Sequence, residues 1–320
     1  YFISLIQEQE QGLRSLRRKE VLTKLEEDLP NIKKAWQWMI RHEQFDAIAD
    51  SSSVLPQLLF QRPREAVEMY QQAREKLSET NPSHHLALGR LYSNQALSQM
   101  YTTPPDQTHM LAQKGLDYSR QAADQEGIVQ GLNALGTSLL NIDFLQANPF
   151  LEEGLSLARQ IGSPSVGFLL RGRMLCKRNS ADFNATNTFF KETLKELREL
   201  GDPISLVFGL LFQGSFLVYY DFLQEGQAIL KEGLALDQEA VIGLQATFYS
   251  EQALVAYKQG NAKEDERLSI EAYKLAQAGG FIQMTSQSLT GLARAALSQS
   301  QAARASDYLK QALTLAHDSR

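Results

Sequence analysis

The chain has 320 residues, of which 43% are hydrophobic and 22% are charged, and its formal net charge is −5. These proportions are typical of a globular protein, and the negative balance argues against nucleic-acid binding through a basic surface. The single cysteine, Cys176, excludes an internal disulfide and favours a reducing, cytoplasmic location. The sequence has neither an apolar run of about 18 residues nor a signal-peptide pattern, so we expect no association with a membrane.

Residues 1–44 carry helical apolar stripes and differ from the rest of the chain. Pro30 interrupts the second stripe, and because proline lacks an amide proton we predict a kink or a new helix start there. Trp36 falls on the apolar side of this stripe and is predicted to anchor a core. The chain begins at Tyr1 without a methionine, inside an apparent helix. We therefore expect residues 1–44 to be a helical segment that links to an upstream domain.

From residue 45 to residue 320 the sequence repeats with a period near 40 residues. Small residues 39 to 42 positions apart mark the second helix of each repeat: Ala73, Gly115, Gly154, Thr193, Gly233, Ala272 and Ala312. Six of these markers have another small residue seven positions earlier, whereas Asp265 takes that place before Ala272. Small residues seven apart lie on one helix face and allow close helix packing. We predict seven helical hairpins that stack into an α-solenoid.

The small residues also carry a family resemblance. Their spacing of 12 and then 7 positions, in Gly214, Gly226 and Gly233 and again in Ala293, Ala305 and Ala312, resembles the tetratricopeptide repeat (TPR). That repeat is usually about 34 residues long, so the period near 40 implies longer helices. Long repeats, together with residues 26–38 (EEDLPNIKKAWQW), are similar to the TPR-like sensor arrays of STAND-class regulatory ATPases, including regulators of the maltose-regulon-activator type.

The resemblance implies an all-α, right-handed solenoid in which the first helix of each hairpin lines a concave groove. It also implies a cytoplasmic protein that takes part in signal transduction or transcription regulation by binding another molecule. The sequence contains no phosphate-binding loop, no HExxH motif and no paired CxxC motif. We therefore predict a module without a catalytic residue, metal or cofactor, although its parent protein could carry an ATPase domain.

The most informative charge pattern is a stretch without acidic residues. Between Ala158 and Ala181 the chain has five basic residues: Arg159, Arg171, Arg173, Lys177 and Arg178. Arg171 and Arg178 are seven apart on a predicted first helix, so they share one face. One interpretation is a solvated charged surface. The other is an anion-binding stripe, because guanidinium groups suit phosphate and carboxylate.

The repeat register places polar and aromatic side chains of other first helices on the same groove. The predicted ligand- or partner-binding residues are Arg90, Asn133, Asn141, Arg171, Arg178, Phe208, Tyr219 and Tyr257. Such a lining could recognise a peptide, a protein segment or a small anionic effector. The alternative is a passive scaffold for protein assembly that has no effector site. We expect no direct contact with nucleic acid in either case.

Overall fold

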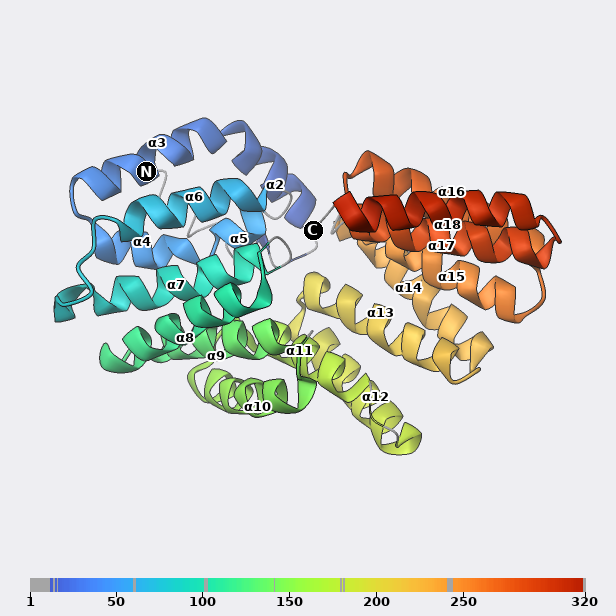
Figure 1. Cartoon of the computed structure of the whole chain (residues 1–320). Coiled ribbons are helices and arrows are strands. Elements are labelled where there is room, and N and C mark those ends of the chain that lie inside the picture. Colours follow the sequence, from blue (N-terminus) through green and yellow to red (C-terminus); the bar gives the residue numbers. More distant parts are fainter. Residues whose placement is uncertain are drawn as a thin grey trace. The chain divides into compact units, whose positions relative to one another are not determined.

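Helices make up nearly all of the described structure (Figure 1). The computed structural model describes residues 12–13, 15, 17–59, 62–100, 103–140, 142–178, 180, 182–240 and 244–318. No strand occurs within these ranges, which confirms the all-α prediction. None of the described helices has the length and apolar character needed to span a membrane. The chain forms two compact units, Tyr1–Ser205 and Leu206–Arg320.

Six regular hairpins account for most of the described residues. They are α7 (His85–Gln99) with α8 (Pro105–Gln121), α9 (Gln125–Leu139) with α10 (Phe144–Ile161), α11 (Val166–Arg178) with α12 (Phe183–Leu200), α13 (Pro203–Tyr219) with α14 (Leu223–Ala240), α15 (Gln245–Lys258) with α16 (Ala262–Ala278), and α17 (Ile282–Ser298) with α18 (Ala302–Asp318). Their order and period match the predicted repeats.

The hairpin before them is irregular. Its first helix is divided into α4 (Phe45–Ser52) and α5 (Leu55–Leu58), and its second helix is α6 (Pro63–Arg74). A proline lies in the first turn of α5, where its missing amide proton costs no helical hydrogen bond. A short 3-10 turn, η1 (Pro82–His84), then leads into α7. With this divided hairpin, the described part of the chain contains the seven repeats that the sequence predicts.

Within the described residues, two further helices precede the repeats and belong to the first unit. They are α2 (Arg18–Glu27) and α3 (Leu29–Arg41), and Pro30 lies in the first turn of α3, which confirms the predicted new start. Trp36 is 2% exposed and donates a hydrogen bond from Nε1 to the carbonyl of Met69 at 3.1 Å, so it joins α3 to α6. The core role of Trp36 is therefore confirmed. The assignment of residues 1–44 as a separate linking segment stays a prediction.

Small residues permit the close approach of successive helices. A Cβ added at Gly131 of α9 would lie 2.8 Å from the Cα of Leu116 in α8. A Cβ at Gly233 of α14 would lie 2.5 Å from the ring of Phe248 in α15. Any larger residue at these positions would push the two helices apart, so the glycines fix how closely one hairpin packs against the next.

Candidate functional site

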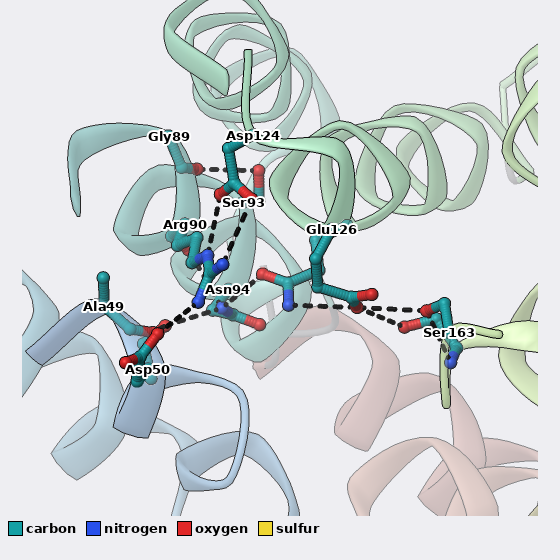
Figure 2. Close-up of polar contacts among 12 residues, drawn as sticks. Ala49, Asp50, Gly89, Arg90, Ser93, Asn94, Asp124, Glu126 and Ser163 are labelled. Carbon is teal, nitrogen blue, oxygen red and sulfur yellow. Dashed lines mark hydrogen bonds and ion pairs between the residues drawn. The ribbon is translucent and has the colours of Figure 1, made fainter. Parts of the chain in front are cut away.

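The first helices of the first unit (α4, α7, α9 and α11) carry a connected set of polar side chains, which we call the first-helix polar network. Arg90 of α7 is its centre (Figure 2). The guanidinium donates to both carboxylate oxygens of Asp124, at 2.7 and 3.1 Å, and to Asp50 at 2.7 Å. Asp124 lies just before the N-terminus of α9, where a negative charge is favourable. One arginine thus ties α4, α7 and α9 together.

The network continues from Asn94, one turn further along α7. Its side-chain amide donates to Ser52 of α4 and to Gln130 of α9, each at 3.1 Å. Glu126, at the start of α9, accepts hydrogen bonds from the hydroxyl of Ser163 at 3.1 Å and from Gln130 at 3.5 Å (Figure 2). Because these partners come from four consecutive hairpins, the network sets the spacing of the first helices.

The surroundings of Arg90 differ from those of a residue that is open to a ligand. Its side chain is 16% exposed, and three of its nitrogens are engaged by carboxylates of the chain. Burial lowers the pKa of Arg90, but the hydrogen bonds and charges of Asp124 and Asp50 outweigh burial and raise the pKa overall. Arg90 is therefore permanently charged and holds the helices together. A ligand could bind its guanidinium only beside the carboxylates of Asp124 and Asp50, which already accept hydrogen bonds from it.

The other predicted residues of the first unit lie on α9 and α11. Asn133 is 7% exposed, and its carbonyl and side-chain oxygens accept hydrogen bonds from Thr137. Arg171 is half-buried, with its guanidinium 4.8 Å from the ring centre of Phe168. Arg178 is exposed at the end of α11. Asn141 lies outside the described residues.

The basic stretch is partly neutralised by the second helices of its neighbours. Arg159 of α10 makes an ion pair with Glu196 of α12 at 2.6 Å, and Arg173 of α11 makes one with Glu152 of α10 at 2.8 Å. These two arginines therefore belong to the contacts between hairpins. The predicted anion-binding pair, Arg171 and Arg178, lies on the same helix as Arg173.

The second unit has a small pocket between the first helices α15 and α17. Its volume is about 70 Å³. The lining residues are Ser250, Glu251, Leu254, Ser269, Gln287, Ser288, Gly291 and Arg294. Hydroxyls, an amide, a carboxylate and a guanidinium thus converge on one place. At about 70 Å³ this hollow is smaller than the pockets that enclose a small molecule, so it has room for one polar group of a ligand.

An ion pair holds Arg294, one of the lining residues, in place. Arg294 donates from Nη2 and Nε to the two carboxylate oxygens of Asp265, at 2.6 and 3.1 Å, and Asp265 is fully buried in α16. The guanidinium also lies 5.1 Å from the ring centre of Tyr257, which is 43% exposed. The buried acid at a position otherwise held by small residues is thereby explained, since Arg294 fills the space and balances the charge.

The remaining predicted residues of the second unit lie on α13. Phe208 is half-buried beside Phe212, with ring centres 6.0 Å apart. Tyr219 is 74% exposed at the end of the helix, where Lys258 of α15 donates to its carbonyl at 3.3 Å. The predicted residues thus fall into two sets, one in each unit. Arg294 and Gln287 were missed, because nothing in the local sequence of α17 shows which helix their side chains meet.

Groups with chemical reactivity are sparse. Burial raises the pKa of the Cys176 thiol to about 11, and Cys176 lies in the core of its hairpin. Among the described residues, no three histidine, cysteine, aspartate or glutamate side chains gather as a metal site would require. The thiol of Cys176 is therefore protonated at neutral pH and is a poor nucleophile.

Comparison with known proteins identifies the fold. No family model and no curated protein matches the sequence. A Rap protein complexed with Competence and Sporulation Factor is similar in structure, with a TM-score of 0.67 and 12% identity over 99% of this chain and 98% of that protein. The apo quorum sensor NprR from B. thuringiensis has a TM-score of 0.64 and 15% identity over 93% of this chain and 83% of that one.

A STAND protein (Signal Transduction ATPase with Numerous Domains) with a tetratricopeptide repeat sensor, from Pyrococcus horikoshii, is also similar. Its TM-score is 0.57 at 14% identity over 88% of this chain, which spans 45% of that protein. At such identities the likeness shows the fold alone. This chain therefore has a TPR-like helical-repeat fold, and the predicted resemblance to such sensor arrays is confirmed at the level of structure.

Proposed function

We propose that this chain is a non-catalytic module that binds a peptide or a protein segment on the exposed face of its first helices. The observation that carries the proposal is the pocket between α15 and α17. Arg294 lines this pocket beside hydroxyl and amide groups, and the exposed ring of Tyr257 lies next to its guanidinium, outside the lining. Arginine and tyrosine are among the residues that most often dominate the energetics of protein interfaces.

The pocket favours a ligand that presents a hydrogen-bond acceptor, because Arg294 offers a donor. Asp265 uses Nε and Nη2 of Arg294, which leaves Nη1 without a partner among the described residues. A main-chain carbonyl or a carboxylate of the bound segment would accept from this nitrogen, and the ring of Tyr257 would cover an apolar side chain. Arg171 and Arg178 would form a separate anion-binding contact within the first unit.

The structural neighbours support a sensory role. One is complexed with a Competence and Sporulation Factor, one is a quorum sensor, and one carries a tetratricopeptide repeat sensor in a signal transduction ATPase. By analogy, this module would belong to a larger cytoplasmic regulator and would report the presence of its ligand through a shift between conformations. A small anionic effector would use the same arginines.

A peptide selection tests this proposal. A random peptide library displayed on phage is selected against the immobilised chain, and the Kd of the enriched peptides is measured by fluorescence anisotropy. Tyr257→Ala and Gln287→Ala should each raise the Kd about tenfold, the effect expected of central interface residues. Arg178→Ala should raise the Kd of the acidic peptides and leave that of neutral ones unchanged.

The matched control is Arg267→Ala. Arg267 is an exposed residue of the second helix α16 and pairs only with Glu264, one turn earlier on the same helix. This variant should bind the peptides as the unchanged chain does. The proposal is contradicted if Tyr257→Ala and Gln287→Ala leave the Kd of the enriched peptides unchanged. Failure to enrich any peptide would contradict it as well and would favour the passive scaffold.

A further inference from the structure

A second hollow lies within the first unit, between helices α3 and α6, and its volume is about 210 Å³. We call it the α3–α6 pocket. It is smaller than the pockets that enclose a drug-sized molecule, so it has room for a group about as large as one amino-acid side chain. Its lining belongs to α3 and α6 and is separate from the pocket between α15 and α17. The lining residues are Lys33, Trp36, Gln37, Glu65, Glu68, Met69 and Gln72.

The pocket combines an apolar base with polar walls. Its two buried lining residues, Trp36 and Met69, are 2% and 6% exposed and are joined by the hydrogen bond from the indole to the carbonyl of Met69. The other lining residues are polar and are half-buried or exposed. Lys33 and Gln37 lie one turn apart on α3, and the polar lining residues of α6 follow one another at intervals of three and four residues. Each set therefore shares one helix face.

The charges of the pocket do not cancel. Lys33 donates from Nζ to Glu65 at 2.5 Å, so these two charges balance each other. An ion pair of the same kind joins α8 to α10 through Arg120 and Glu153. Glu68 is the additional charge, because no described residue makes an ion pair or a hydrogen bond with its carboxylate. The pocket therefore carries one net negative charge above an apolar base.

We propose that the α3–α6 pocket binds an alkylammonium or guanidinium group, as found on lysine and arginine side chains and on free amines. The cation donates hydrogen bonds to the carboxylate of Glu68 and to the amide oxygens of Gln37 and Gln72. Hydrogen bonds of this kind, in which both groups are charged, are the strong ones. The aliphatic stem of the ligand lies on Trp36 and Met69, since long cationic side chains cover apolar surface in this way.

The neighbouring parts of the chain do not supply this cation. Residues 1–11, which precede α2, contain two glutamates and neither lysine nor arginine. Lys33 is already bound to Glu65, and Arg62, which precedes α6, pairs with Glu26 of α2 at 3.8 Å. The carboxylate of Glu68 is therefore the acceptor that remains for a ligand.

Trp36 reports on the pocket directly, because Trp38→Phe leaves it as the only tryptophan of the chain. Cadaverine and a blocked pentapeptide, with one lysine between alanines, are each titrated against this variant of the whole chain while its fluorescence is followed. We expect a saturable change with at least one of them. Tighter binding of the peptide would assign the pocket to a protein side chain, and tighter binding of cadaverine would assign it to a free amine.

Glu68→Gln, made in the same variant, should weaken the binding at least tenfold, because a neutral amide replaces the charged acceptor. Glu68 is exposed, so this substitution leaves the fold intact. Lys33→Met should strengthen the binding about threefold, since it removes the like charge and frees Glu65.

Two controls separate this site from a general attraction between opposite charges. Glu75 follows α6 and is exposed outside the lining, so Glu75→Gln should leave the Kd unchanged. A pentapeptide with Nε-acetyl-lysine keeps the stem and loses the charge, and it should not bind. The proposal is wrong if neither probe gives a saturable change, if Glu68→Gln leaves the Kd as it was, or if the acetylated peptide binds as tightly as the unmodified one.

Discussion

At the scale of single residues, the pair of Asp265 and Arg294 shows how a position that breaks the repeat pattern is accommodated. Other repeats place a small residue where Asp265 stands, and the buried carboxylate is tolerated because a guanidinium engages both of its oxygens. A buried charge that loses its partner is strongly destabilising, whereas replacing both members of such a pair is often nearly neutral. We therefore expect the single and the double variant of this pair to differ in their free energy of unfolding.

Arg294→Met should lower the free energy of unfolding by about 2 to 4 kcal/mol, because it leaves the carboxylate of Asp265 buried without a counter-ion. The double variant Asp265→Ala with Arg294→Met should recover to within about 1 kcal/mol of the unchanged chain, since it restores the small residue of the other repeats. Urea unfolding followed by far-UV circular dichroism measures both. A double variant as unstable as the single one would contradict this account.

A second residue-scale prediction concerns Glu79, in the turn between α6 and α7. Its carboxylate accepts hydrogen bonds from Tyr92 at 2.6 Å and from Lys114 at 3.0 Å. These hydrogen bonds, that of Tyr92 first, lower the pKa of Glu79 from 4.5 to about 2. A lowered pKa means that the ionised form stabilises the fold. Its contribution is complete above pH 4.5 and is lost as the pH falls toward 2.

Glu79→Gln should therefore lower the urea midpoint at neutral pH, and the difference from the unchanged chain should shrink below pH 4.5 and vanish near pH 2. Tryptophan fluorescence is a suitable probe, because Trp36 and Trp38 both belong to the same compact unit as Glu79. A difference that stays constant down to pH 2 would show that this carboxylate is not held in its ionised form by the fold.

At the scale of helices, close contacts at glycines determine how one hairpin meets the next. The contacts are of two kinds. A Cβ at Gly131 would lie 2.8 Å from the backbone Cα of Leu116, which cannot move without moving α8. A Cβ at Gly172 would meet only the end of the Leu151 side chain, at 3.0 Å, which can rotate away. Two glycines on equivalent helices should therefore respond differently to the same substitution.

Gly131→Ala should destabilise the chain by about 1 to 3 kcal/mol, because it separates two packed helices. Gly172→Ala should be nearly neutral, because the greater helix propensity of alanine, about 1 kcal/mol, offsets the small rearrangement of Leu151. Urea unfolding of the two variants compares them directly. Equal effects of the two substitutions would contradict the distinction between backbone and side-chain contacts.

The sequence predicted the helices better than it predicted the site. Small residues and prolines act locally, so the seven hairpins, the new helix start at Pro30 and the buried Trp36 could be predicted. The division of the first helix of hairpin one into α4 and α5 was not predicted, although Pro56 in the first turn of α5 is a local signal of a new helix start. The partners of Arg90 and Arg294 lie 29 or more residues away in sequence, so their ion pairs depend on the packing of neighbouring hairpins. The predicted binding residues themselves remain proposals.

At the scale of the whole molecule, the chain is a TPR-like helical-repeat protein in two compact units. In the first unit, a polar network fixes the row of first helices, whereas in the second unit a pocket opens between α15 and α17. Both kinds of helix provide contacts between hairpins: Arg159 of α10 pairs with Glu196 of α12, whereas Arg90 of α7 pairs with Asp124 and Asp50.

The central claim is that a ligand binds to the first helices. Hydrogen–deuterium exchange, measured with and without a peptide from the phage selection, shows which helices the ligand protects. We predict slower exchange in the first helices, above all α15 and α17 around the pocket, and unchanged exchange in α8, α10 and α12. Protection confined to those second helices, with α15 and α17 unchanged, would contradict the central claim.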